Sequence, residues 1–381
     1  TACTPKVGEG STMTEMTGDV IAEVRGQVGC ITLNRPRALN ALSLGMVRDL
    51  MATLLAWQKD PRVLAVALRG SNKEGSFGAF CAGGDIRFLH QAGSQGNPQI
   101  EDFFTEEYAL NHLIHQYGKP YVAFMDGIVM GGGMGISQGG SVRVVTERTR
   151  MAMPETAIGL FPDVGGGYFL SRCPGRVGEW LALTGETIGA GDAVAFGLAD
   201  GCIPSAEQAA LWQQLGSQHF ADGKAVEQLL ASNFIAADAQ HTSARAEIDQ
   251  YFAAASVADI VAALEASSSV WAQATAVTLR KRSPLMLHVV LEQIRRARGI
   301  GLAADLRMER DMVRHCFYLR PGQSETLEGI RALAVDKDHS PKWWPARIED
   351  VTPAMWQPFF DSPWPAHAHP LAHLECRPVA G

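Results

Sequence analysis

The chain has 381 residues, of which 46% are hydrophobic and 19% are charged, so it can bury a large core, and its composition excludes disorder as the main state. Its 33 basic and 40 acidic side chains give a net charge of −7, which argues against proteins that bind nucleic acids or anionic membranes, because both need a basic face. Glycine is more frequent than in average proteins, with 39 of the 381 residues, and many of these glycines lie in three tight clusters.

Cysteine usage and the N-terminal sequence bear on the cellular compartment. The seven cysteines are an odd number and form no Cys-x-x-Cys pair, which favours a reduced compartment over a disulfide framework. No run of eighteen apolar residues suggests a membrane span, and the first twenty residues contain acidic side chains but no arginine, unlike a secretory or transit leader. We therefore expect a cytoplasmic protein.

The first half of the chain predicts alternating strands and helices. Residues 20–24 and 30–33 are short β-rich runs separated by glycines, a pattern typical of a hairpin. From about Ser43, apolar residues recur at helical spacing. A strand, a helix and another strand are expected at residues 63–68, 101–116 and 121–125. Because these strands lack polar alternation, they predict an α/β domain whose sheet is buried on both faces.

The character of the sequence changes after about residue 205. Residues 207–320 are rich in Ala, Leu, Gln and Glu and predict a helical region, in which Ser283 and Pro284 have the order of an N-cap and a first helical residue. We therefore divide the chain into a disordered or expression-derived leader, an α/β core, a helical C-terminal region and an irregular proline-rich tail. These four parts are residues 1–17, 18–205, 206–362 and 363–381.

Two of the glycine clusters follow predicted strands or strand-loop segments. The first is Phe80–Asp85, with Gly83 and Gly84, and the second is Asp126–Gly135, with a triple glycine. Glycines between a strand and a helix allow the backbone to approach a ligand, and free N–H groups at the helix start can receive an oxygen that gains negative charge. Two such loops meet the requirement of an oxyanion hole with two donors. Tight turns and close helix–sheet packing are the alternative explanation of each cluster.

Neither cluster is a nucleotide-binding motif, because the chain lacks G-x-x-x-x-G-K-[ST] and the spacing does not fit G-x-G-x-x-G. Residues 135–139 match the G-x-S-x-G nucleophile elbow around Ser137. In that motif the serine occupies the strand-to-helix turn itself. Here the turn is expected at the triple glycine, which places Ser137 one turn inside the helix and argues against a serine nucleophile.

The third cluster follows two carboxylates in an apolar segment. Glu155 and Asp163 lie in Met151–Gly167, whose other residues are mostly apolar or glycine. A carboxylate in apolar surroundings has a raised pKa and can act as a base, an acid or a nucleophile. Capping of helix ends is the alternative role of both residues, and spacing alone does not show that they converge.

At these motifs the chain resembles the crotonase (enoyl-CoA hydratase/isomerase) superfamily. The resemblance runs from about Ile31 to Ile203 and rests on the Asn34-Arg35-Pro36 segment and the three glycine-rich segments. The string Pro154–Leu170 and the late segment Asp336–Trp343 are similar to the branch that hydrolyses 3-hydroxyisobutyryl-CoA, an enzyme of valine catabolism. The resemblance implies a crotonase-like (ClpP/crotonase) spiral of ββα units, with a helical C-terminal region.

The resemblance also implies a role for each matching residue. The N–H groups of Gly84 and Gly132 would hold the thioester oxygen, Glu155 would be the main catalytic carboxylate, as nucleophile or as base for water, and Asp163 would hold the substrate hydroxyl or assist proton transfer. Glu107 matches a substrate-contacting glutamate of the branch, although a solvated helix face is its alternative role. The residues expected to line the CoA portion of the substrate are Asn34, Arg35, Ala38, Ala82 and Asp85.

One departure from the hydratase pattern bears on the reaction. Hydratases of the superfamily use two glutamates, and the first falls where this chain has Gly135, whereas Asp163 stands where hydratases usually carry a small residue. The pair Glu155 and Asp163 therefore favours thioester hydrolysis over hydration of a double bond. A hydratase or isomerase of the same superfamily, and a non-catalytic acyl-CoA binder, are the alternatives.

The remaining candidates have simpler explanations. His367, His369, His373 and Cys376 have spacings that a metal site could use, but imidazoles in a proline-rich tail are more often solvated. Arg280–Arg282 could meet CoA phosphates, but a solvated helix end is the simpler expectation. We expect an acyl-CoA substrate, no metal, and no cofactor beyond the CoA moiety. The superfamily often forms trimers, which favours a homo-oligomer, whereas the helical C-terminal region could replace the contacts of a neighbouring copy.

Overall fold

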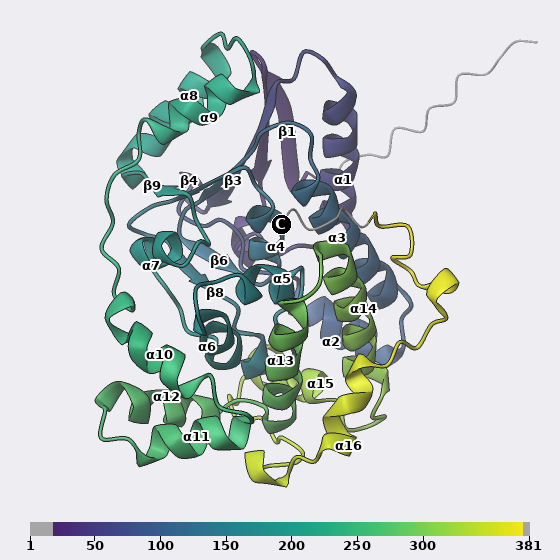
Figure 1. The fold of residues 1–381 in the computed structure, drawn as a ribbon. Helices are drawn as coiled ribbons and strands as arrows, with labels where there is room; N and C mark the ends of the chain where they lie inside the picture. The colour runs from purple at the N-terminus through teal and green to yellow at the C-terminus, as the bar shows by residue number, and fades with distance from the viewer. Residues whose placement is uncertain (1–17, 376–381) are drawn as a thin grey trace, which may run out of the picture.

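A computed structural model of the protein describes residues 18–375 (Figure 1). The leader expected at residues 1–17 and the last six residues of the expected tail lie outside the described residues. Within the described part, no helix combines the length and the apolarity that crossing a bilayer requires. The five described cysteines are buried thiols.

The predicted hairpin and buried strands form one mixed sheet. Strands β1 and β2 pair antiparallel, β4 pairs antiparallel with β3, and the other neighbours are parallel in the order β1-β2-β3-β5-β7-β9. A second, two-stranded parallel sheet pairs β6 with β8. The strands are β1 (Val20–Arg25), β2 (Val28–Leu33), β3 (Ala65–Asn72), β4 (Gly75–Ser76), β5 (Tyr121–Met125), β6 (Ile128–Met130), β7 (Val142–Val145), β8 (Arg150–Ala152) and β9 (Gly201–Cys202).

Most of the predicted bounds agree with the structure. Strand β5 covers the predicted residues. The two expected helices are present as α1 (Leu44–Lys59) and α3 (Gln99–His115), and the Ser43 side chain caps the N-terminus of α1. The strand expected at 63–68 is instead β3, which begins two residues later and ends at Asn72. The extension arises because residues 71 and 72 pair with β4 in a short hairpin that apolar patterning does not reveal.

The remaining helices surround the sheet and extend the molecule beyond it (Figure 1). Those of the first half are α2 (Ile86–Gln95), α4 (Gly132–Gln138), α5 (Gly166–Ser171), α6 (Val177–Thr184) and α7 (Ala190–Ala195). The helical C-terminal region contains α8 (Gln208–Ser217), α9 (Gly223–Ala231), α10 (Arg245–Tyr251), α11 (Val257–Ala266), α12 (Val270–Arg280), α13 (Pro284–Ala297), α14 (Leu302–Tyr318), α15 (Glu325–Ile330) and α16 (Pro353–Trp356). Helix α13 begins at Pro284 with Ser283 as its cap, as predicted.

Two hydrophobic cores lie on the two faces of the main sheet. The smaller one joins alternate residues of β2, β3, β5 and β7 to α8 and α9. The larger one joins the opposite residues of the same strands to α1 and α3 and continues into α13 and α14. Figure 1 shows α13 and α14 beside α5. The helical C-terminal region therefore packs directly against the segment that carries the third glycine cluster.

Two expectations about polar segments are wrong in part. The tail imidazoles were expected to be solvated, but His369 is only 7% exposed, and its Nδ1 accepts a hydrogen bond from the Leu371 N–H. At the end of α12, Arg280 pairs with Glu265 and Glu349, and the Arg282 guanidinium donates to the Thr184 carbonyl oxygen. Neither guanidinium of this helix end is therefore merely solvated.

Candidate active site

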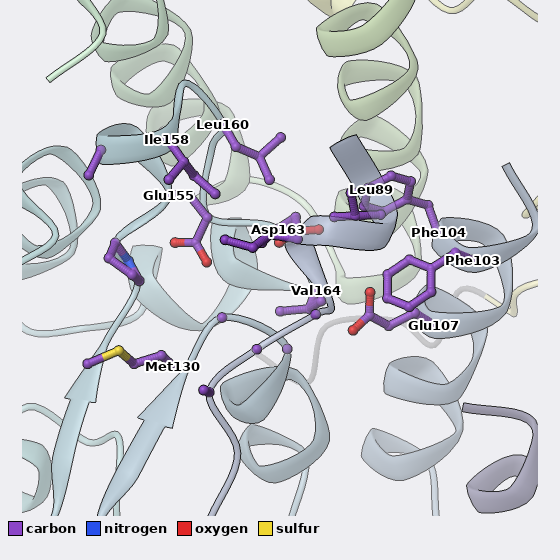
Figure 2. Close-up of a pocket in the computed structure, with 18 of the residues that line it drawn as sticks. Leu89, Phe103, Phe104, Glu107, Met130, Glu155, Ile158, Leu160, Asp163 and Val164 are labelled. Atoms are coloured by element: carbon purple, nitrogen blue, oxygen red, sulfur yellow. The ribbon is translucent and has the colours of Figure 1, made fainter. Parts of the chain in front are cut away.

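The predicted catalytic carboxylates and oxyanion glycines meet at one cavity of about 240 Å³. Three carboxylates, Glu107, Glu155 and Asp163, approach it from α3, from the turn after β8 and from the segment before α5 (Figure 2). Their exposed fractions are 2%, 5% and 6%, so each carboxyl group lies away from bulk water. The apolar walls are formed by Ile86, Leu89, Phe103, Phe104, Met130, Ile158, Leu160, Val164 and Leu333.

The two predicted oxyanion donors lie side by side at this cavity. Gly132 is the first residue of α4, so its N–H has no partner within the helix. At the other loop, the Leu42 N–H donates to Gly83 O and the Asp85 N–H donates to Leu42 O, which directs the intervening Gly84 N–H away from Leu42. A Cβ on Gly132 would lie 3.3 Å from the Gly84 nitrogen, so the two backbones approach closely.

Glycine is required just before each of these donors. Gly83 has φ = +112° and Gly131 has φ = +49°, conformations that are disfavoured for other residues. A Cβ on Gly131 would also lie 2.9 Å from the Glu155 carboxylate oxygen. The second glycine cluster therefore turns the chain into α4 and leaves room for the Glu155 carboxyl group.

Glu155 begins a 3-10 turn, Glu155–Ile158, immediately after β8 and Pro154. Its Oε2 atom is buried and makes no hydrogen bond within the protein. Burial raises the pKa of Glu155 well above its usual range, and the nearby Asp163 and Glu107 carboxylates raise it further. A buried carboxyl group with one unpartnered oxygen is poised to take a proton or a ligand contact.

Asp163 lies in the segment between this turn and α5. Its Oδ2 atom accepts a hydrogen bond of 2.8 Å from the Tyr108 hydroxyl group. Burial raises the pKa of Asp163 to about 6, although the Tyr108 hydrogen bond acts in the opposite direction. Asp163 thus titrates closer to neutral pH than an ordinary aspartate does.

Glu107 is a buried residue of α3, not part of a solvated helix face. Its Oε1 atom has no hydrogen-bond partner within the protein, and a Cβ on Gly132 would lie 2.7 Å from that atom. Burial and then the Asp163 charge raise the pKa of Glu107 well above its usual range. The Glu107 carboxyl group therefore lies against the predicted oxyanion hole.

Position 135 has no room for a side chain. A Cβ on Gly135 would lie 2.6 Å from the Val164 Cβ and 2.9 Å from the Asn111 amide nitrogen. Real Cβ atoms essentially never show such contacts, so a glutamate here would displace one of these two buried residues. The structure therefore leaves no space for a fourth carboxylate extending from α4.

Several predicted residues lie outside the cavity lining. Ala82 lines the cavity, but Asn34, Arg35, Ala38 and Asp85 do not. The Arg35 guanidinium pairs with Asp85 at 2.8 Å, and Asp85 also caps α2 by accepting from the Phe88 N–H. Ser137 is buried inside α4, where its hydroxyl group donates to Gly133 O at 2.8 Å, so it is not placed as a nucleophile. Across residues 18–375, no group of three His, Cys, Asp or Glu residues could hold a metal ion.

Some residues of the site were not anticipated. Tyr108 and Asn111 follow Glu107 on the buried side of α3, and the i, i+4 spacing of Glu107 and Asn111 is a signal that could have found the second of them. Val164, which lines the cavity, has φ = +58°, a left-handed conformation that is rare for a β-branched residue. No pattern in the sequence indicates that conformation.

Comparisons with known proteins bear on the family of the chain. A sequence model of the enoyl-CoA hydratase/isomerase family matches residues 28–360. A mitochondrial 3-hydroxyisobutyryl-CoA hydrolase from Xenopus tropicalis is 40% identical over 354 residues, which are 91% of this chain and 89% of the relative. The 3-hydroxyisobutyryl-CoA hydrolase 1 of Arabidopsis thaliana is 39% identical over 356 residues, covering 90% of this chain and 91% of the relative.

Two solved structures share the fold along most of their length. A carnitinyl-CoA dehydratase from Mycobacterium thermoresistibile has a TM-score of 0.83 at 39% identity and covers 90% of this chain and 96% of its own. An enoyl-CoA hydratase from Rhodobacter sphaeroides 2.4.1 has a TM-score of 0.81 at 37% identity, with 91% and 98% covered. The expected α/β crotonase fold with a helical C-terminal region is confirmed.

Proposed function

The chain belongs to the enoyl-CoA hydratase/isomerase family, and from that premise we propose that it is an acyl-CoA thioester hydrolase that converts 3-hydroxyisobutyryl-CoA and water into 3-hydroxyisobutyrate and CoA. The observation that carries the proposal is the pairing of Glu155 and Asp163 in one cavity, with no space for a carboxylate at position 135. The names of the relatives support the choice of substrate.

The proposed reaction uses the two glycine amides and Glu155. The thioester oxygen lies between the N–H groups of Gly84 and Gly132, which stabilise the negative charge that forms when the carbonyl carbon is attacked. In one route, the oxygen of a water molecule attacks the carbonyl carbon and its proton passes to the Glu155 carboxylate. In the other route, the Glu155 carboxylate attacks the carbonyl carbon itself, and water then hydrolyses the acyl-enzyme. When the carbonyl re-forms, the C–S bond breaks and the CoA sulfur leaves with one proton. No cofactor beyond the CoA of the substrate takes part.

Asp163 is proposed to recognise the acyl chain. A carboxylate of pKa about 6 is ionised at neutral pH and accepts a hydrogen bond from a substrate hydroxyl group, while Tyr108 holds its other side. The apolar walls formed by Phe103, Phe104 and Leu160 suit a short hydrocarbon chain. A 3-hydroxypropionyl thioester would satisfy the same contacts, and a role in valine catabolism depends on the branched substrate.

Two other functions compete with this proposal. The first is double-bond chemistry, which is favoured by the fold shared with proteins named as a dehydratase and a hydratase. The second is a non-catalytic acyl-CoA binder, which would keep the cavity without using its carboxyl groups in a reaction. With 3-hydroxyisobutyryl-CoA and crotonyl-CoA as substrates, we expect free thiol from the first and unchanged enoyl absorbance from the second. Loss of the enoyl absorbance would support a hydratase, and binding without either change would support a binder.

The acid groups predict a specific pH dependence. Because the pKa of Asp163 is about 6 and the pKa of Glu155 is raised by burial, protonation of either group removes an acceptor that the reaction needs. Thus kcat/KM should decrease as the pH is lowered through about 6. It should also still be increasing with pH in the range where an ordinary glutamate is already fully ionised. Loss of thioester absorbance between pH 5 and pH 9 measures this profile. A flat profile between pH 5 and pH 8 would contradict it, and in Asp163→Asn the step near pH 6 should disappear.

The compartment and the assembly are further parts of the proposal. The buried free thiols support a reduced compartment, and we keep the cytoplasm as the proposed location, although the animal relatives are named mitochondrial. Cell fractionation with an antibody to the chain tests this location. A homo-oligomer stays a prediction, which mass measurement in solution would test.

A further inference from the structure

The segment that carries Asp163 has an unfavourable backbone conformation. Val164 has φ = +58° and Gly165 has φ = +86°, so two successive residues are left-handed. Glycine adopts this conformation freely, whereas a β-branched residue is a genuine outlier there. Such a conformation persists only when surrounding contacts determine it. The contacts that hold Val164 in place are therefore of interest for the reaction.

Three buried polar side chains from the helical C-terminal region hold this segment, and we call them the clamp: Gln293 of α13 and Asp305 and Glu309 of α14. Glu309 accepts hydrogen bonds from the Gly165 N–H at 2.8 Å and from the Gly167 N–H at 2.9 Å, one on each carboxylate oxygen. Asp305 accepts from the Tyr168 N–H at 2.8 Å. All three clamp side chains are fully buried.

Gln293 closes the clamp on the other side of Asp163. Its amide nitrogen donates to Pro162 O at 2.7 Å and to Glu309 Oε1 at 3.2 Å. The backbone is thus held at Pro162, one residue before Asp163, and at Gly165, two residues after it. These contacts fix the direction in which the Asp163 side chain leaves the backbone.

Fold stability alone gives a weak reason for two carboxyl groups here. Removing carboxylates from water is costly, and well-packed apolar side chains often stabilise a fold as much or more. Burial raises the pKa of Asp305 to about 6, and burial and Asp305 raise the pKa of Glu309 well above its usual range. None of the three side chains lines the cavity, so none of them contacts a substrate held there.

We propose that Glu309, assisted by Gln293 and Asp305, is a positioning residue that holds Val164 in its left-handed conformation and thereby aims Asp163 into the cavity. The inference rests on the proposed function, because it assumes that Asp163 acts on the substrate. It also gives the helical C-terminal region a task in the reaction, since α13 and α14 supply every member of the clamp.

The test replaces Glu309 with glutamine. In Glu309→Gln the amide nitrogen cannot accept from a backbone N–H, so one of the two glycine amides loses its partner. We expect hydrogen exchange of peptide 162–170 to accelerate at least about tenfold. We also expect kcat for thiol release to fall about 10- to 100-fold, because small misplacements of a reacting group have effects of this size, while KM stays within about twofold of the wild-type value. Glu292→Gln on α13, which alters only an ion pair with Arg296, should change neither quantity.

Two further variants keep the test decisive if Glu309→Gln does not fold. Gln293→Leu removes only the contacts to Pro162 and Glu309 and should change exchange and kcat in the same direction by a smaller factor. In a Val164→Gly background, the loss in kcat from Glu309→Gln should shrink to under about threefold, because glycine adopts the left-handed conformation without the clamp.

The outcomes separate this inference from the proposed function. If the wild-type chain releases no thiol, the proposed function fails, while hydrogen exchange still reports whether Glu309 holds the segment. Unchanged exchange in Glu309→Gln would overturn the inference. Faster exchange with unchanged kcat would overturn it too, since the clamp would then serve only the stability of the fold.

Discussion

Replacing Glu155 with glutamine is expected to lower kcat for thiol release by about 10³-fold or more, because the amide can neither accept the proton of water nor attack the thioester. Glutamine has the shape of a protonated glutamate, and the raised pKa of Glu155 indicates that the site tolerates a neutral group there. The affinity for acyl-CoA should therefore stay within about threefold. Thiol release measures kcat, and calorimetric titration with the intact thioester measures Kd on the inactive variant.

The matched control for this variant is Glu106→Gln. Glu106 lies on α3 next to the site, but its side chain is partly exposed and pairs with Arg48 on the surface, so its loss should leave kcat unchanged. If Glu155→Gln kept more than about a tenth of the wild-type kcat, Glu155 would be neither the general base nor the nucleophile of the reaction.

Replacing Gly132 with alanine is expected to lower kcat by about 10²–10³-fold, as much as the loss of an oxyanion-hole donor typically does, because the added methyl group would block the oxyanion hole although the backbone N–H remains. The added methyl group would lie 2.7 Å from the Glu107 carboxylate oxygen and 3.3 Å from the Gly84 nitrogen. It would therefore displace Glu107 and enter the space beside both proposed donors. Thiol release at saturating substrate measures the effect.

Gly84→Ala is the comparison that makes this prediction specific. Both variants keep the backbone N–H, but a Cβ on Gly84 would meet only the Phe103 ring, at 3.3 and 3.5 Å, and not the other donor or Glu107. We expect its kcat to fall by less than about tenfold, as for a tight but tolerated contact. Equal losses in the two alanine variants would contradict the proposed geometry of the oxyanion hole.

The sequence predicted those parts of the structure that depend on local patterns. Strand β5 is a buried apolar run, α1 follows Ser43 with the predicted hydrophobic spacing, and Ser283 caps α13, so hydrophobic spacing and the capping signal at Ser283 were enough. The resemblance to a known family brought Glu155 and Asp163 together, which spacing alone could not do. Steric constraints at Gly135, in contrast, became visible only with Val164 and Asn111 in place.

The clamp shows what local patterns cannot predict. Glu309 contacts Gly165 across a separation of 144 residues, and Asp305 and Glu309 look in the sequence like ordinary charged residues of an amphipathic helix. The left-handed conformation of Val164 is imposed by tertiary contacts against the preference of its side chain. Similarly, Arg35 and Asp85 were expected beside the CoA but pair with each other, 50 positions apart.

The most direct test of the central claim is a multiple-turnover reaction of the wild-type chain with 3-hydroxyisobutyryl-CoA in ¹⁸O-labelled water, in which the label reaches the product whether Glu155 acts as base or as nucleophile. We predict one free thiol for each acyl group consumed, with the label in the carboxylate of the released 3-hydroxyisobutyrate, because hydrolysis forms a C–O bond and breaks the C–S bond. An intact thioester with rising enoyl absorbance would contradict this account, since it would show that the cavity removes water from the acyl chain instead of adding water to the thioester.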